Sequence, residues 1–507
     1  MVDGMKATVT AHKDYTIAKI DDRIYSAFLE HLGRAIYTGI YEPDHPTADK
    51  NGMRGDVAQL VKDLNIPFVR YPGGNFVSAY NWEDGIGPRD QRPTRLDLAW
   101  HTSESNAVGV HEFAAWCEAV NTKMMLAINL GSRGLDEARN FVEYVNGPTG
   151  SYWGDLRKKN GRAEPFDVKL WCLGNEMDGP WQVGHKTAME YGRLASETAK
   201  TLRAFDKSLE LIVCGSSNSD MKTYPEWERV VLEHTYDSVD HISLHMYFAN
   251  RAKNTANYLA LNHKLDTYIA TVESTINLVK ANKRSKHNVY ISFDEWNVWY
   301  HSNVQDRDIL GGKGGWPHAP RLLEDIYNFE DVLQVGCILN TFIRRSNVVK
   351  IACIAQLVNV IAPIMTDPKG AAWRQTIYYP YYFASIFGRG TALNLAVKCP
   401  SYDADVADNV TYVDVSGVYD ENEGMLTFFA INRHGTETLD VEFSLQGFEA
   451  ARIVDHQVIT HSILEAVNTA TNQTNVAPKK GNGAKVEDGI LKTHLPPHSY
   501  QMLRLKV

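Results

Sequence analysis

Short apolar runs alternate with helical patterns between about residue 20 and about residue 385. Between the runs, apolar residues recur every three or four positions, as in Phe113, Trp116, Cys117 and Val120, which predicts helices. Runs that alternate with helices are typical of parallel βα units, so an α/β fold is expected. Eight such runs close a (β/α)8 TIM barrel. The expected strands are residues 26–31, 67–71, 124–130, 170–173, 211–214, 242–247, 289–293 and 351–358.

The pattern changes after Gly388. Residues 412–419 and 425–432 flank a polar loop, and apolar residues from Leu439 to Leu445 alternate with polar ones. This alternation predicts half-buried antiparallel strands. We therefore expect a catalytic barrel at residues 21–385 and a C-terminal, jelly-roll-like β-sandwich at residues 386–507. The N-terminal strand segment, residues 1–20, is expected to complete the sandwich.

Length and charge narrow the class of protein. A chain of 507 residues is long for one domain and allows a large core. The balance of 52 basic and 61 acidic residues gives a net charge of −9, and no basic patch is evident, so neither nucleic acid nor a membrane is expected as a partner. The six cysteines lack CxxC spacing, and the N-terminus lacks the apolar core of a signal peptide. These features predict a cytoplasmic protein with reduced thiols.

Two acidic residues stand where barrel strands are expected to end. The fourth run finishes in Asn175 and Glu176, and the seventh in Asp294 and Glu295. Carboxyl groups from these two strands can face each other across the barrel mouth, as glycosidic cleavage requires. Taken alone, each acid could equally be a helix N-cap or part of a surface ion pair. Because Asp294 is one residue from Glu295, strand alternation predicts that it points away from the site and has a structural role.

Other strand ends carry polar side chains. Taken singly, each is more often a satisfied core residue than a ligand contact. Together they form a ring of carboxylate, amide and hydroxyl groups that suits a polyhydroxylated substrate. Four tryptophans in expected loops could stack on sugar faces. The polar candidates are Glu30, Arg70, Asn75, His245, Tyr247 and Gln356, and the tryptophans are Trp82, Trp100, Trp299 and Trp316.

Metal and cofactor sites are not expected. His241 and His245 share a strand face, but no HExxH motif accompanies them. The glycine-rich segment 311–315 lacks the P-loop spacing, and the chain contains neither a serine-hydrolase elbow nor a dinucleotide fingerprint. We therefore predict no metal site, no serine-hydrolase site and no dinucleotide site.

Six segments resemble glycoside hydrolase family 51, the α-L-arabinofuranosidases. The resemblance covers nearly the whole chain. The segments are FLEHLGR at 28–34, VRYPGGNF at 69–76, CLGNEMDGPWQ at 172–182, SLHMY at 243–247, DEWNVWY at 294–300 and IAQLVNV at 354–360.

The resemblance implies a retaining enzyme without a cofactor that releases terminal arabinofuranose from arabinan or arabinoxylan, with Glu176 as acid/base and Glu295 as nucleophile. It also implies a homo-oligomer, often a hexamer. Two alternatives remain: a retaining endoglucanase or xylanase of the same fold, and a non-catalytic carbohydrate-binding protein. The substrate contacts implied by the resemblance are Glu30, Arg70, Asn75, Asn175, Tyr247 and Gln356, with Trp100 and Trp299 beside the sugar.

Overall fold

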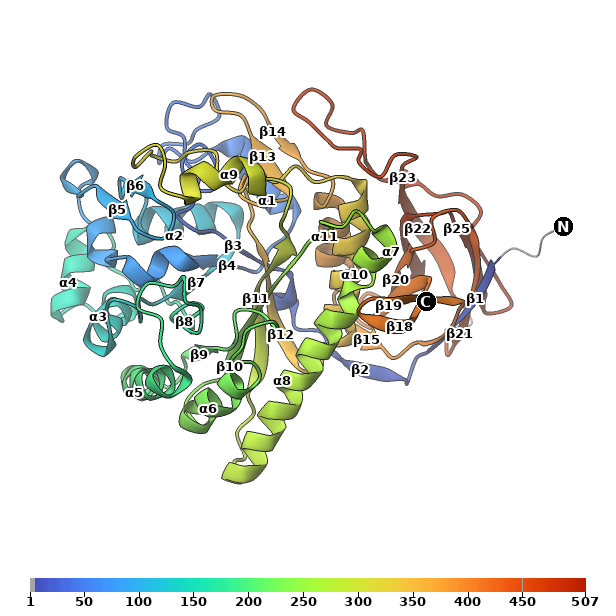
Figure 1. The fold of residues 1–507 in the computed structure, drawn as a ribbon, viewed down its shortest axis with the longest axis horizontal. Coiled ribbons are helices and arrows are strands. Elements are labelled where there is room, and N and C mark those ends of the chain that lie inside the picture. The colour runs from blue at the N-terminus through green and yellow to red at the C-terminus, as the bar shows by residue number, and fades with distance from the viewer. Residues whose placement is uncertain (1–4, 449) are drawn as a thin grey trace.

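The computed structural model describes residues 5–448 and 450–507. Eight strands, each parallel to its neighbours, form a closed barrel in the order β10-β11-β12-β3-β4-β7-β8-β9 (Figure 1). The predicted barrel is confirmed. Its strands are β3 (Ser26–Phe28), β4 (Phe68–Tyr71), β7 (Lys123–Ala127), β8 (Leu170–Leu173), β9 (Glu210–Cys214), β10 (His241–Phe248), β11 (Tyr290–Val298) and β12 (Val349–Ala355).

Helices follow the strands and surround the barrel (Figure 1). The predicted apolar stripe at residues 113–120 lies on α2, where Phe113, Trp116 and Cys117 are buried. The helices are α1 (Gly55–Asp63), α2 (Val110–Val120), α3 (Leu135–Asn146), α4 (Tyr152–Lys159), α5 (Ala188–Phe205), α6 (Glu226–Thr235), α7 (Thr255–Leu259), α8 (Leu261–Lys283), α9 (Asn303–Leu310), α10 (Phe329–Arg344) and α11 (Tyr378–Phe387).

Short elements fill the connections of the barrel. Two hairpins pair β5 (Arg95–Asp97) with β6 (Thr102–Glu104) and β13 (Ile364–Thr366) with β14 (Ala372–Arg374). The first hairpin carries the loop that ends in Trp100 and His101. The 3-10 helices are η1 (Asp22–Tyr25), η2 (Asn75–Ala79), η3 (Trp82–Gly85) and η4 (Arg89–Gln91).

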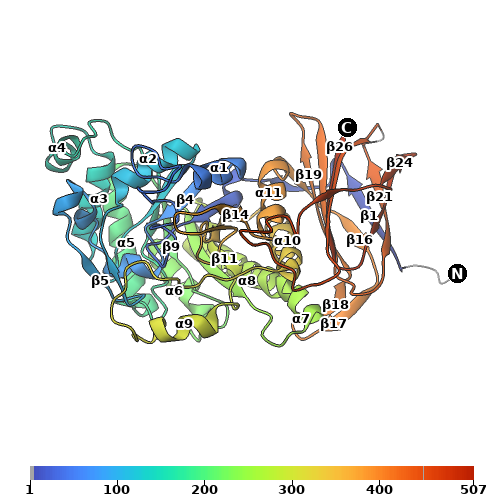
Figure 2. The same ribbon diagram turned by 90° about the horizontal axis from the view of Figure 1, so that it is seen from above.

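Two sheets make the C-terminal sandwich, which stands beside the barrel (Figure 2). One has the order β16-β1-β21-β25-β24 and the other β2-β15-β19-β20-β26-β22-β23, while β17 and β18 form a separate hairpin. The strands are β1 (Met5–His12), β2 (Thr16–Lys19), β15 (Thr391–Leu393), β16 (Ala396–Lys398), β17 (Ser401–Ala404), β18 (Ala407–Thr411), β19 (Val413–Asp420), β20 (Met425–Asn432), β21 (Leu439–Gln446), β22 (Arg452–Thr460), β23 (Lys479–Lys480), β24 (Lys485–Glu487), β25 (Ile490–Leu495) and β26 (Ser499–Lys506).

The N-terminal strands belong to these sheets. β1 lies between β16 and β21, and β2 pairs with β15 at the edge of the other sheet. Residues 1–4 of the expected N-terminal segment lie outside the described residues. The predicted alternation in β21 is confirmed, because Leu439, Val441, Phe443 and Leu445 are buried between the sheets.

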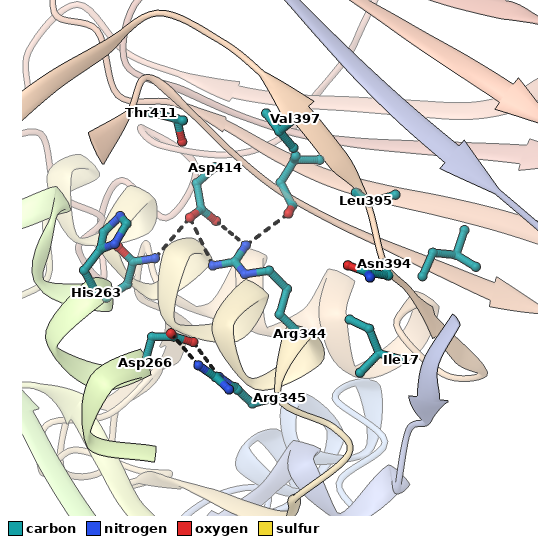
Figure 3. Close-up of a pocket in the computed structure, with 13 residues that line it drawn as sticks. Ile17, His263, Asp266, Arg344, Arg345, Asn394, Leu395, Val397, Thr411 and Asp414 are labelled. Carbon is teal, nitrogen blue, oxygen red and sulfur yellow. Dashed lines mark hydrogen bonds and ion pairs between the residues drawn. The ribbon is translucent and has the colours of Figure 1, made fainter. Parts of the chain in front are cut away.

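The other face of the seven-stranded sheet packs on α10. The fit is close: a Cβ added to Gly336 on this helix would come within 2.9 Å of the Tyr500 ring on β26. Polar groups are also buried at this junction (Figure 3). Asp414 on β19 accepts hydrogen bonds from Asn340 at 2.7 Å, Arg433 at 2.7 Å and Arg344 at 3.2 Å. A cavity of about 380 Å³ adjoins this cluster.

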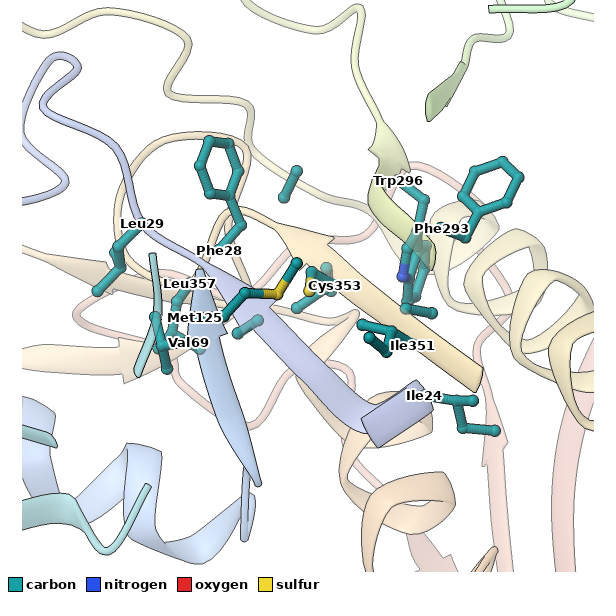
Figure 4. Close-up of a cluster of buried hydrophobic side chains, with 14 of the residues drawn as sticks. Ile24, Phe28, Leu29, Val69, Met125, Phe293, Trp296, Ile351, Cys353 and Leu357 are labelled. Atoms are coloured by element: carbon teal, nitrogen blue, oxygen red, sulfur yellow. The ribbon is translucent and has the colours of Figure 1, made fainter. Parts of the chain in front are cut away.

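Apolar side chains fill the lower part of the barrel, as expected for strands with both faces covered. Phe28, Met125, Ile351 and Cys353, from three different strands, are at most 1% exposed and belong to one cluster (Figure 4). This packed interior leaves the C-terminal ends of the strands as the place for a ligand.

All six cysteines are free thiols, and all except the half-buried Cys399 are buried. Among the described residues, the helices are too short or too polar to cross a membrane.

Candidate active site

A cavity of about 570 Å³ opens at the C-terminal ends of the barrel strands. Eight of the ten residues expected in the site line it, and they come from strands and loops that are far apart in the sequence. These residues are Glu30, Asn75, Trp100, Glu176, Tyr247, Glu295, Trp299 and Gln356.

Glu176 follows β8 through a tight turn. Gly174 has φ +92°, and Glu176 itself has φ +43°, a left-handed conformation that is uncommon for a residue with a side chain. Its carboxylate is held on both sides: Trp181 Nε1 donates to Oε2 at 2.7 Å, and His245 Nδ1 lies 2.9 Å from Oε1. Residues with such uncommon backbone conformations cluster at functional sites.

Glu295 stands opposite on β11 and is 5% exposed. Arg70 Nη1 donates to its Oε1 at 2.7 Å, and the Tyr247 hydroxyl donates to its Oε2 at 2.8 Å. Burial raises the pKa of the Glu295 carboxyl, and the charges of His245 and Arg70 oppose this rise. One oxygen of Glu295 and one of Glu176 lie within 4.8 Å of each other.

Arg70 and Asn175 lie beneath the cavity and do not line it. Besides contacting Glu295, the Arg70 guanidinium donates from Nη2 to Asn175 Oδ1 at 2.6 Å, and it stacks over the Phe28 ring at 4.7 Å. The Asn175 amide in turn reaches Asn75 Oδ1 at 3.4 Å. These contacts fix the orientation of Glu295 from below.

Glu30 forms another wall of the cavity. Its Oε1 accepts from the Phe76 backbone at 2.8 Å and from Trp100 Nε1 at 3.0 Å, and its backbone N–H donates to Gln356. A Cβ on Gly74 would lie 2.3 Å from Glu30 Oε2, so only glycine fits there. Burial, with a further contribution from Glu295, raises the pKa of Glu30 to about 8. Burial therefore favours the neutral form of this carboxyl, which can donate a hydrogen bond.

The predicted direction of the Asp294 side chain was wrong. The β11 strand has one more residue than its neighbours between Phe293 and Trp296, which is a β-bulge. The bulge turns both Asp294 and Glu295 into the barrel. Asp294 is fully buried below the cavity, where its Oδ1 lies 2.8 Å from His245 Nε2.

Comparison with known proteins identifies the family of the chain. Two family models match the chain: the α-L-arabinofuranosidase 1 domain at residues 60–264 and the α-L-arabinofuranosidase C-terminal domain at residues 294–499. The chain is 53% identical over 501 residues to the intracellular exo-α-(1→5)-L-arabinofuranosidase 1 of Bacillus subtilis, covering 99% of each chain. The chain belongs to the α-L-arabinofuranosidases of glycoside hydrolase family 51.

Two further relatives of this arabinofuranosidase come from Bifidobacterium longum. An exo-α-(1→6)-L-arabinofuranosidase is 43% identical over 510 residues, covering 99% of this chain and 97% of the other. The solved structure of a family 51 α-L-arabinofuranosidase superposes with a TM-score of 0.94 at 39% identity, covering 99% of both chains. A glucanase-xylanase from a metagenome library, 13% identical with a TM-score of 0.59, shares the fold alone.

The tryptophans of the arabinofuranosidase differ from expectation. Trp100 and Trp299 line the cavity, but Trp82 is buried against Phe141 and does not face a ligand. Trp316 contacts His101 with its ring tilted by 40° and is not among the residues that line the cavity. Sequence reasoning missed Trp181, which is 47% exposed at the rim beside Glu176. Its place five residues after an expected strand-end acid was the available signal.

Glu176, His245 and Glu295 come close enough together to hold a metal ion. Their atoms already have protein partners, however, and the Arg70 guanidinium 2.7 Å from Glu295 supplies positive charge at the same place. We assign no metal to them, and the prediction of a metal-free site stays a prediction.

Proposed function

We propose that the arabinofuranosidase releases terminal α-L-arabinofuranosyl residues by a retaining double displacement, with Glu295 as nucleophile and Glu176 as acid/base. The observation that carries this proposal is the distance between them: an oxygen of each carboxylate lies within 4.8 Å of the other at the cavity floor. Retaining glycosidases hold the two groups ~5–5.5 Å apart, whereas inverting enzymes need ~6.5–9.5 Å to admit a water.

The surroundings of the two glutamates support these roles. Arg70 and Tyr247 donate to Glu295, which favours a carboxylate aimed at the anomeric carbon. Glu176 stands across the cavity, where a leaving oxygen can receive its proton. In the second step the same group activates water, because removal of the first proton leaves it as a base.

We propose that the remaining lining residues bind the sugar. Glu30, Asn75 and Gln356 offer one carboxyl and two amide groups to its hydroxyls, and Trp100 and Trp299 offer flat faces. We propose that Arg70 and Asn175 act indirectly, since they lie below the cavity. The exo-α-(1→5) names of three relatives, at 50–53% identity, support α-(1→5)-linked arabino-oligosaccharides as the substrate. Hydrolysis of (1→5)- and (1→6)-linked arabinobioses, with arabinoxylan as a third substrate, tests this preference.

Trapping tests the nucleophile. A 2-fluoro-arabinofuranoside with a good leaving group should label Glu295, because the fluorine slows the second step and the ester accumulates. Peptide mapping locates the label. Label on the neighbouring Asp294 would overturn the assignment, and a product of inverted configuration would overturn the mechanism.

Azide rescue tests the acid/base. Glu176→Ala should hydrolyse a dinitrophenyl arabinofuranoside with a near-normal first step, but it should fail on arabinobiose, whose leaving group needs a proton. Added azide should speed the second step and give an arabinosyl azide of retained configuration. Equal losses on both substrates without rescue would show that Glu176 has another role.

We also propose the domain division at residues 21 and 386, a cytoplasmic location and a homo-oligomer. The intracellular names of the same three relatives support the location. Light scattering of the purified chain measures the oligomeric state, and a mass of 57.0 kDa would exclude the oligomer.

A further inference from the structure

A buried histidine that does not line the cavity contacts the proposed acid/base from below, and a buried aspartate contacts this histidine in turn. His245 Nδ1 lies 2.9 Å from Glu176 Oε1, and His245 Nε2 lies 2.8 Å from Asp294 Oδ1. The imidazole ring thus bridges two carboxylates. A ring can donate from both nitrogens only when it is doubly protonated.

The charges around the ring are unbalanced. Glu176 from the end of β8 and Asp294 and Glu295 from β11 all face it, with Glu295 Oε2 3.6 Å from Nδ1. The nearest cation is Arg70 on β4, which contacts Glu295 at 2.7 Å and Asp294 at 3.8 Å. The other polar or titratable neighbours are Ser243 and Tyr247 on β10, which donate to Asp294 and Glu295, and Cys172 on β8, whose thiol lies 3.8 Å from Asp294.

This surplus of carboxylates keeps a proton on the ring. Burial alone would lower the pKa of His245, but Glu295, Asp294 and Glu176 together raise it to about 10. The protonated Nδ1 faces Glu176 Oε1 at 2.9 Å, which is within reach of a direct proton transfer. In the free enzyme, the histidine therefore holds a proton beside the proposed acid/base.

We propose that His245, anchored by Asp294, stores the proton that Glu176 delivers to the leaving group. The proposal rests on the roles proposed above for Glu176 and Glu295. A bound sugar displaces water from Glu176 and disfavours its charged form, so the proton moves from Nδ1 to the carboxylate. Glu176 then protonates the glycosidic oxygen as its bond to the anomeric carbon breaks and Glu295 bonds to that carbon.

The second step returns the proton. The ring is neutral after the first step, with its Nε2–H still donated to Asp294. Water attacks the anomeric carbon, Glu295 leaves as a carboxylate, and the proton lost by the water passes through Glu176 to Nδ1. No proton is gained or lost over the whole cycle, and no cofactor is required.

Asp294→Asn tests whether His245 stores the proton, because the amide keeps an oxygen that can accept a hydrogen bond from Nε2 but loses the negative charge. Loss of the negative charge should make the ring a poorer base. We expect kcat/KM for arabinobiose to fall about tenfold or more, and the alkaline limb of its pH profile to move to lower pH. For a dinitrophenyl arabinofuranoside, whose leaving group needs no proton, kcat/KM should change less than about threefold. His245→Gln should show the same difference between substrates. Equal losses on both substrates, or an unmoved alkaline limb, would mean that the pair only holds Glu176 in place.

A matched control separates this effect from damage to the fold. His31 is also buried between a carboxylate and a hydroxyl, with Glu104 at 2.9 Å and Tyr71 at 2.6 Å, but it lies outside the cavity. His31→Gln should therefore change both substrates by the same factor. Because the azide test of Glu176→Ala is independent, the proposed function can survive even if Asp294→Asn contradicts the proton store.

A measurement without changes in the site covers the case in which these variants do not fold. Nitrogen NMR of the histidine-labelled enzyme should show a doubly protonated ring at pH 9. His301, whose pKa is also raised by Asp331 against the effect of burial, is removed from the spectrum with His301→Gln. If this variant showed no doubly protonated ring at pH 9, the proposal would be wrong.

Discussion

Two of the buried clusters in which arginine meets carboxylates differ in their ratio of acids to cations. The barrel-mouth cluster, formed by Arg70, Glu176, His245, Asp294 and Glu295, has more acids than cations. The interface cluster between barrel and sandwich has one acid, Asp414, which faces Arg344 (Figure 3). Asp414 also faces Arg433, and Asn262 and Asn340 supply further donors.

The titration of the acids reflects this difference. Burial alone would raise the pKa of Asp414, but Arg344 and Arg433 lower it to about 2. At the barrel mouth burial raises the pKa of Glu295, whereas Arg70 and His245 hold the pKa of Asp294 below its ordinary value against the effect of burial. A cluster whose acid is surrounded by cations stabilises one ionised state. A cluster with more acids than cations holds protons that can be transferred between its members. The first arrangement favours stability and the second favours chemistry.

Glu295→Gln should give the largest effect. The amide cannot form the glycosyl ester, so kcat for an aryl arabinofuranoside should fall by roughly 10⁴ or more. The melting temperature should stay the same or rise, because a surplus buried acid is removed. Calorimetry and a steady-state assay measure the two effects, and a large loss of stability would contradict the comparison.

Asp414→Asn should do the reverse. It leaves the buried Arg433 without its counter-ion, and unfolding free energy should fall by about 3–5 kcal/mol while kcat/KM of the folded enzyme is retained. The stabilisation from the lowered pKa is present above the ordinary value of 3.8 and lost as pH falls through 2. In denaturant titrations, wild type and variant should therefore converge towards pH 2, and a constant difference would contradict this account.

Arg70→Lys should lower kcat about a hundredfold, since an ammonium cannot contact Glu295 and Asn175 with the planar geometry of the guanidinium. Arg344→Lys in the interface cluster is the matched control. Its side chain is 32% exposed, and we expect near-normal turnover there. Normal turnover of Arg70→Lys would show that Arg70 does not position Glu295.

Glu30→Gln should have the smallest effect on stability, visible as a change in how the melting temperature depends on pH. The raised pKa of Glu30 contributes stability that is complete below about pH 4.5 and is lost as pH rises through 8. The amide keeps an acceptor for Phe76 and Trp100 but does not ionise. The melting temperature should fall less between pH 5 and 8 in the variant than in wild type, and parallel curves would contradict the assignment.

The strand ends show how far sequence reasoning reached. Continuous apolar runs located all eight barrel strands, because a parallel strand is buried on both faces and carries a strong signal. The acids that end the fourth and seventh runs, Glu176 and Glu295, lie together in the structure. The ends of parallel strands converge at one barrel face, so their positions in the sequence were enough to bring them together.

Local backbone geometry was beyond that reasoning. The bulge in β11 reversed the expected direction of Asp294, and a similar turn after Gly174 brought Trp181 beside Glu176. One extra residue in a strand changes which side chains face inward without changing the apolar pattern.

The sequence by itself determined the barrel, the sandwich and the two opposed glutamates, because buried positions recur along the chain with the period of each helix or strand. Only the tertiary structure decided that Asp294 and His245 stand beneath Glu176 and that Arg70 is outnumbered by acids. The state of a buried charge depends on every neighbour within a few ångströms, and these neighbours come from different strands, which for Arg70 and Glu295 are 225 residues apart in the chain.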